Sequence, residues 1–91
     1  MVEVQNVAGS SRHPLSRENT TWKRYWENHA NRSWPFNCAC CDFGMADVGG
    51  HVHKVGERKQ YIVPMCTSCN GKGPDVIFRV DERYLVPVVD D

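Results

Sequence analysis

The chain has 91 residues, of which 41% are hydrophobic, so it has room for one small domain with a thin apolar core. Eleven lysines and arginines balance eleven aspartates and glutamates, which excludes a strongly basic nucleic-acid coat protein and an acidic tail protein. No apolar run approaches the roughly 18–20 residues of a membrane-spanning helix, so we expect no membrane partner. The composition indicates a small globular domain that needs an additional stabilising element.

The five cysteines supply a candidate for that element. The first residues, Met1–Asn6, show no basic start followed by an apolar stretch, so we expect no secretory signal and a cytoplasmic location. In that reducing compartment cysteines more often bind metal than form disulfides, and an odd number cannot all pair within one chain. We therefore expect metal ligands and not a disulfide framework.

Residues 1–20 are polar and lack periodicity, so we expect an irregular N-terminal arm, in which Glu3–Val7 has the composition of a short strand. Apolar and aromatic side chains then recur with helical spacing over residues 21–31, and Pro35 prevents the helix from continuing. The recurring positions are Trp22, Tyr25, Trp26, His29 and Ala30. We expect an amphipathic helix whose tryptophans anchor the core; the alternative is an exposed aromatic face that stacks on bases.

Short strands are expected after this helix. They cover residues 51–55, 60–65, 75–80 and 84–89, with turns at 56–59 and 81–83. Pro87 places the last strand at an edge of the sheet. The expected fold class is therefore α+β, with one N-terminal amphipathic helix and short antiparallel strands in a single domain over residues 21–91.

Two Cys-x-x-Cys pairs carry the strongest chemical signal: Cys38 with Cys41, and Cys66 with Cys69, with 24 residues between them. In each pair a tight turn directs both sulfurs inward, and two such turns complete the tetrahedral four-sulfur shell that a structural zinc prefers. Because a closed shell leaves no open coordination position, we expect one zinc ion that stabilises the fold and catalyses no reaction. The alternatives are free buried thiols, a redox pair, which lacks its usual βαβ pattern here, and an iron–sulfur cluster, which the spacing alone does not separate from zinc.

Cys40 is the spare cysteine. The Cys-x-x-Cys spacing favours its neighbours on either side, Cys38 and Cys41, as the ligands. We expect Cys40 to be a small buried side chain or a thiol beside the metal.

The order of these motifs, a cysteine knuckle, a hairpin and a second Cys-x-x-Cys that opens a short helix, resembles a treble-clef zinc finger. Over residues 22–70 the chain is similar to the HNH, or His-Me finger, nucleases, and still closer to a group of small bacterial zinc-binding proteins. The resemblance rests on the upstream tryptophan-bearing helix, on Cys38 and Cys41, on Gly50-His51-Val52, and on Tyr61-Ile62-Val63-Pro64-Met65-Cys66-Thr67-Ser68-Cys69-Asn70. It implies a small treble-clef-like zinc domain.

For a nuclease, the resemblance implies that His51 is the general base and that Asn70 binds a catalytic magnesium or manganese ion distinct from the zinc. His53 shares a strand face with His51 and is a further candidate ligand. Two positions differ from the family pattern: Gly50 stands where a metal-binding residue precedes the base, and Tyr61 where an asparagine orients it. The structural alternative is that His51 is a packed strand residue and that Asn70 completes a turn.

A small excess of positive charge lies on the hairpin and the second knuckle. Its members are Lys54, Arg58, Lys59 and Lys72, against Glu57 alone. This excess indicates either contact with a DNA or RNA backbone or an ordinary solvated face. A third class of function is a protein-interaction module that offers the edge strand at 84–89 to a partner, although Pro87 and the terminal aspartates blunt that edge. We therefore expect a structural zinc-binding domain, with a nuclease, its catalytically degenerate nucleic-acid-binding relative and an interaction module as alternatives.

Overall fold

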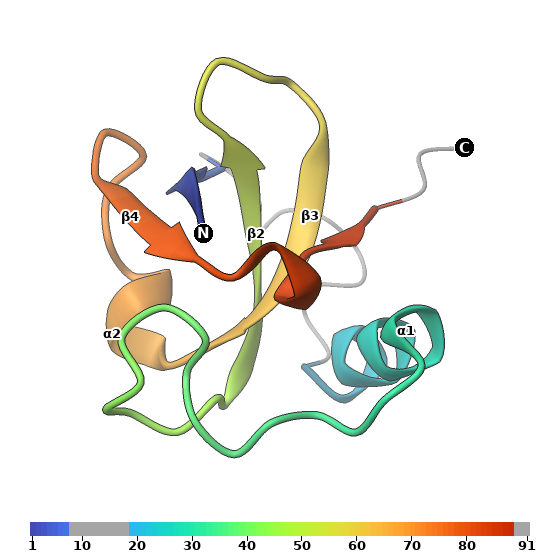
Figure 1. The fold of residues 1–91 in the computed structure, drawn as a ribbon. Coiled ribbons are helices and arrows are strands. Elements are labelled where there is room, and N and C mark those ends of the chain that lie inside the picture. The colour runs from blue at the N-terminus through green and yellow to red at the C-terminus, as the bar shows by residue number, and fades with distance from the viewer. Residues whose placement is uncertain (8–18, 89–91) are drawn as a thin grey trace.

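The fold is built around a five-stranded antiparallel sheet with the strand order β4-β1-β2-β3-β5 (Figure 1). The computed structural model describes residues 1–7 and 19–88. The strands are β1 (Val2–Asn6), β2 (Val48–Lys54), β3 (Gln60–Met65), β4 (Ile77–Val80) and β5 (Val86–Pro87). The helices are α1 (Asn19–Ala30), the short α2 (Thr67–Asn70) and a single 3-10 turn, η3 (Glu82–Tyr84). The chain is therefore an α+β protein, as its sequence predicts.

β1 lies in the interior of this sheet, between β2 and β4. Val4 pairs with Lys54 on one side and with Phe78 on the other, and its side chain is fully buried. The short strand expected at Glu3–Val7 is thus joined by hydrogen bonds to strands of the domain at 21–91. Residues 19 and 20, also expected in the irregular N-terminal arm, belong to α1, and residues 8–18 lie outside the described residues.

The β2–β3 hairpin extends further than the sequence predicts, because Val48 pairs with Met65 at its far end. Gly49 and Gly50, which precede the strand expected at 51–55, both belong to β2. A Cβ atom at Gly49 would lie 2.8 Å from the Cβ of Trp22, and one at Gly50 would overlap the sulfur of Met65. The two glycines therefore permit close contacts on both faces of the strand.

The last two strands are shorter than expected and lie at opposite edges of the sheet. β4 pairs with β1, whereas β5 pairs with β3. Figure 1 shows the segment between them, which contains η3, passing over the sheet. The side chain of Asp81 accepts a hydrogen bond from the backbone N–H of Arg83, and this cap stabilises the turn that carries the chain across.

An apolar core lies on each face of the sheet. α1 packs on one face, over β2, β3 and β5. The core beneath it contains Trp22, Trp26, Ile62 and Val86. The core of the opposite face contains Val4, Val52, Tyr61, Val63, Met65, Val80 and Leu85, together with Cys38, Cys66 and Cys69. Two thin cores thus share one sheet, and the cysteines belong to the core opposite α1.

Backbone and side-chain hydrogen bonds fix the C-terminal end of α1. The helix ends at Ala30, and the next residue, Asn31, has a left-handed φ of 57° and donates its N–H to the carbonyl of Glu27 at 3.0 Å. The indole N–H of Trp26 donates to the carbonyl of Tyr84 at 2.8 Å. This hydrogen bond connects the helix to the segment that leads into β5. No helix among the described residues is long and apolar enough to cross a bilayer.

Candidate metal centre

The sulfur atoms of Cys38, Cys41, Cys66 and Cys69 lie together, all within 4.8 Å of one another. The Sγ atoms of Cys41 and Cys66 are 3.8 Å apart. Four thiolates that each bind one zinc ion at about 2.3 Å stand about 3.8 Å apart at the corners of a tetrahedron. The cluster therefore has the size of a site for one metal ion, and the four cysteines predicted as ligands are the four that the fold assembles.

The first knuckle is a tight hairpin within residues 36–46. The backbone N–H of Cys38 donates to the carbonyl of Gly44 at 2.8 Å and so closes the loop. Inside it, the N–H of Cys40 points at the sulfur of Cys38 at 3.4 Å, and the N–H of Asp42 donates to the carbonyl of Cys38 at 3.0 Å. Asp42 has a left-handed φ of 63°, which turns the chain back directly after the second ligand.

The second knuckle is the start of α2. Cys66 caps this helix, and its sulfur accepts a hydrogen bond from the N–H of Cys69 at 3.4 Å. The N–H of Asn70 donates to the carbonyl of Cys66 at 3.0 Å. The first knuckle is joined to the same region because the N–H of Ala39 donates to the carbonyl of Pro64, in β3, at 2.9 Å. Local turns thus direct each pair of sulfurs, and the end of the β2–β3 hairpin brings the pairs together.

Two residues that the sequence did not associate with this site help to hold it. The side-chain amide of Asn6, in β1, donates to the carbonyls of Cys69 and Lys72, each at 2.9 Å. Gly44 lies against Cys66 so closely that a Cβ atom there would be 2.7 Å from the Cys66 Cβ. An isolated asparagine and a loop glycine carry no recognisable pattern, so only the folded chain identifies them.

The surroundings of the sulfurs affect their pKa values in opposite directions. Backbone N–H groups of Gly44 and, next, of Phe43 lower the pKa of Cys41 to about 6. Burial is the main reason that the pKa of Cys69 is raised well above its usual value. A bound cation would offset the cost of ionising such buried, crowded thiols, and a four-cysteine donor set suits a thiophilic divalent ion. The residues present therefore fit a metal ion.

Cys40 lies outside the four-sulfur cluster. Its side chain is half-buried, and burial followed by the proximity of Cys38 raises the pKa of its thiol. Cys40 is thus a partly buried thiol beside the four-sulfur cluster.

The candidate base, His51, and the candidate catalytic-metal ligand, Asn70, lie on opposite faces of the sheet. His51 is only 3% exposed, and its ring meets the ring of Trp22 edge-on, with 4.6 Å between the centroids. Asn70 is exposed at the end of α2, and its Oδ1 would lie 3.1 Å from a Cβ atom at Gly50. Because adjacent strand residues point to opposite faces, Gly50 faces α2 and His51 faces α1. The fold does not bring His51 and Asn70 together.

The positions around these two candidates are filled by packing. The Met65 side chain occupies the space into which a side chain at position 50 would project. His53 lies on the His51 face, and its Nδ1–H donates to the carbonyl of Lys54 at 3.0 Å. The side chain of Tyr61 is buried in the core opposite α1. The structure assembles four thiols in this region, and the described residues contain no second cluster of three or more His, Cys, Asp or Glu side chains.

The four basic residues of the expected nucleic-acid surface make different contacts. Lys54 donates to a carboxylate oxygen of Glu82 at 2.7 Å, so its charge is paired. Lys54 and Lys59 both lie near the ring of Tyr61, at 5.3 and 5.7 Å from its centroid. The others are Arg58, which is exposed in the hairpin turn, and Lys72, which lies over the ring of Phe78. Lys54, Lys59 and Lys72 thus contact a carboxylate or an aromatic ring of the same chain.

Comparison of the chain with protein-family models, curated proteins and solved structures finds no match.

Proposed function

We propose that the chain is a structural zinc-binding domain, in which one zinc ion holds the two cysteine knuckles together. The observation that carries this proposal is the convergence of four sulfur atoms, all within 4.8 Å of one another, from two Cys-x-x-Cys turns. Zinc favours four thiolates in a closed tetrahedral shell, and such a shell contributes directly to folding. An iron–sulfur cluster is disfavoured because several irons would hold the sulfurs farther apart than a single ion does.

The proposal includes a treble-clef arrangement. It is supported by the order of the first knuckle, the β2–β3 hairpin and α2, with Cys66 at the start of the helix. The hydrogen bond from Ala39 to Pro64 supports it further, because it places the knuckle at the end of the hairpin. This arrangement agrees with the resemblance to the His-Me finger nucleases in residues 22–70.

We further propose that the chain is a catalytically silent relative of those nucleases. The two positions that would hold the catalytic ion, Gly50 and Asn70, are adjacent, but glycine offers no ligand and the Met65 side chain fills the space. The candidate base, His51, is buried under α1 on the other face. A general base must reach the water that it activates, and this histidine faces away from Asn70.

The metal proposal is tested by the zinc content of purified variants. We expect one tightly bound zinc per wild-type chain, loss of tight binding in Cys66→Ser, and retention in Cys40→Ser, which removes the thiol outside the cluster. Metal content is measured by mass spectrometry after gel filtration. Zinc that is lost from Cys40→Ser but kept in Cys66→Ser would show that the ligand set is wrong. Iron in place of zinc in the purified chain would show that the proposed metal is wrong.

The proposal that the chain has no nuclease activity is tested with plasmid DNA and a folded RNA in the presence of magnesium or manganese. We expect no cleavage above the background of a His51→Ala variant, because the geometry separates the candidate base from Asn70. Metal-dependent cleavage by the wild type that disappears in His51→Ala would contradict a silent site.

A further inference from the structure

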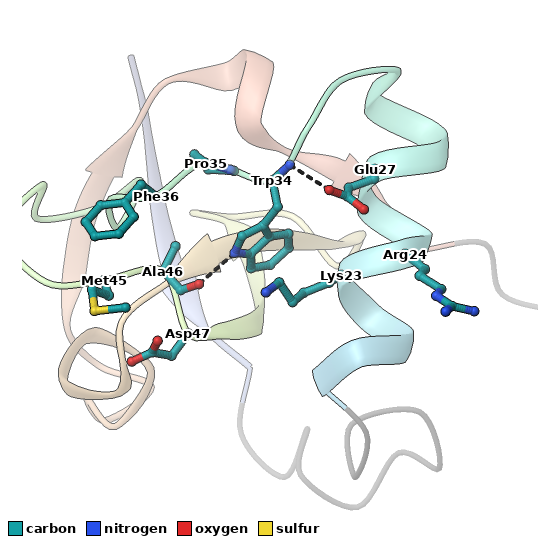
Figure 2. Close-up of a pocket in the computed structure, with 9 residues that line it drawn as sticks. All are labelled: Lys23, Arg24, Glu27, Trp34, Pro35, Phe36, Met45, Ala46 and Asp47. Carbon is teal, nitrogen blue, oxygen red and sulfur yellow. Dashed lines mark hydrogen bonds between the residues drawn. The ribbon is translucent and has the colours of Figure 1, made fainter.

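An open cavity of about 480 Å³ lies between α1 and the first knuckle (Figure 2). The Trp34 side chain forms part of its wall, and Phe36 and Met45 line it from the knuckle. Phe36 is 74% exposed and Met45 is 53% exposed, although both are large apolar side chains. Exposed apolar groups that gather around a concavity are typical of a binding surface, whereas isolated ones are ordinary.

Trp34 is held in place by hydrogen bonds on two sides (Figure 2). Its backbone N–H donates to a carboxylate oxygen of Glu27 at 2.8 Å, and its indole N–H donates to the carbonyl of Ala46 at 2.6 Å. Its ring also meets Trp26 edge-on, with 5.5 Å between the centroids. The indole therefore offers a fixed apolar surface, and little conformational entropy of the Trp34 side chain is lost when a ligand binds.

The two rims of the cavity carry opposite charge. Lys23 and Arg24 lie on the α1 rim, and the Lys23 ammonium is 5.5 Å from the centroid of the Trp34 ring. Asp47 lies on the knuckle rim, and residues 36–47 contain no lysine or arginine. Glu27 also lies on the α1 rim, where its carboxylate accepts the hydrogen bond from the backbone of Trp34, so this rim carries two cations and one carboxylate. A ligand that matches both rims needs negative charge at one end and neutral or positive charge at the other.

This pattern favours a protein ligand over a nucleic acid. The knuckle segment carries Asp42 and Asp47 without a cation, and the proposed centre of four thiolates and one divalent ion would add negative charge, so this rim disfavours a phosphate backbone. Tryptophan, phenylalanine and methionine are the side chains enriched at protein interfaces.

We propose that this cavity binds an extended segment of a partner protein. The segment places one bulky apolar side chain against Trp34, toward the part of the cavity that Phe36 and Met45 line, and a carboxylate of the same segment pairs with Lys23 or Arg24. This activity goes beyond the structural role of the metal, which keeps the knuckle rim in position and takes no part in the contact.

The test uses the full zinc-loaded chain and short fluorescein-labelled peptides. The peptides have a central Trp, Leu or Ser and carry Asp-Glu, Ser-Ser or Lys-Arg on one flank. We expect the peptides with an apolar centre and an acidic flank to bind most tightly by fluorescence anisotropy and to shift the Trp34 indole signal in a nitrogen–proton correlation spectrum. The Ser-centred peptides should bind at least about tenfold more weakly.

Two exposed phenylalanines provide a matched pair of variants. Phe36→Ser should weaken peptide binding by about tenfold or more, whereas Phe43→Ser should leave it unchanged, because Phe43 is 96% exposed and does not line the cavity. Lys23→Glu should remove the preference for the acidic flank. Equal zinc content in all variants keeps this test separate from that of the metal proposal.

Several results would overturn the inference. One is that no peptide binds, and another is that Phe36→Ser and Phe43→Ser behave alike. Binding of an oligothymidine or oligouridine probe that is lost in Phe36→Ser would assign the cavity to nucleic acid. A dimer in sedimentation that Phe36→Ser dissociates would assign it to a second copy of the chain.

Discussion

At the scale of single residues, the metal centre depends on a glycine that carries no ligand. A Cβ atom at Gly44 would lie 2.7 Å from the Cβ and 3.1 Å from the Sγ of Cys66. Because Cys66 is held by its cap to α2, the substitution Gly44→Ala must displace one knuckle from the other. We expect Gly44→Ala to lose about 1–3 kcal/mol of stability and to bind zinc more weakly in competition with a chromophoric chelator.

Gly73 is the control for this prediction. It follows the second knuckle, and a Cβ atom there would meet nothing within 4 Å. We expect Gly73→Ala to keep the wild-type zinc affinity. Equal zinc affinity of Gly44→Ala and Gly73→Ala would mean that the two knuckles can move apart without weakening zinc binding.

At the scale of elements, β1 and α2 are connected by one buried side chain. Asn6 is 7% exposed, and its amide donates to the carbonyls of Cys69 and Lys72. Removing the amide would leave two carbonyls near the metal centre without this donor. We expect Asn6→Ala to lower the free energy of unfolding of the zinc-loaded chain by about 1–3 kcal/mol in urea.

The control for β1 is Glu3→Ala, at an exposed position of the same strand. It should change stability by less than about 0.5 kcal/mol. If Asn6→Ala is as stable as Glu3→Ala, the two hydrogen bonds do not connect the strand to the knuckle.

At the scale of the whole molecule, the two cores are thin, so we expect the proposed metal ion to contribute much of the stability of the fold. One core has Trp22, Trp26, Ile62 and Val86 at its centre, and the other is completed by cysteine side chains. In such a domain the free energy of metal binding becomes folding free energy. We expect a strong chelator at neutral pH to abolish the native circular dichroism and the dispersion of the amide proton signals.

Added zinc should restore both signals, and added magnesium should not, because thiolates favour the softer ion. The Cys66→Ser variant should already resemble the chelated wild type. A chain that keeps its spectrum after complete metal loss would show that the sheet is stable without its four-sulfur centre.

Local features of the sequence were sufficient for much of the candidate site. The spacing of Cys38, Cys41, Cys66 and Cys69 predicted the cluster, since each pair is directed by a turn of its own residues. The β3 strand at Gln60–Met65 agrees with its expected bounds, because β-branched and aromatic residues fill a short run between a turn and a cysteine.

Other expectations failed where partners lie far apart in the sequence. Gly49 and Gly50 have the composition of a loop, but pairing with β3 and close contacts with Trp22 and Met65 place them in a strand. The strands expected at 75–80 and 84–89 were each shortened and lie at opposite edges, because β1 and β3 provide their separate pairing partners.

The sequence by itself determined the α+β class and the four cysteines that gather, because ligand spacing, turns and helical periodicity are local properties. Only the tertiary structure decided that β1 lies inside the sheet, that Asn6 and Gly44 contact the four-cysteine cluster, and that Trp34 lines a cavity. It also decided that His51 and Asn70 lie on opposite faces. Strand order and the packing on each face of a sheet are contacts between distant segments, and no local pattern encodes them.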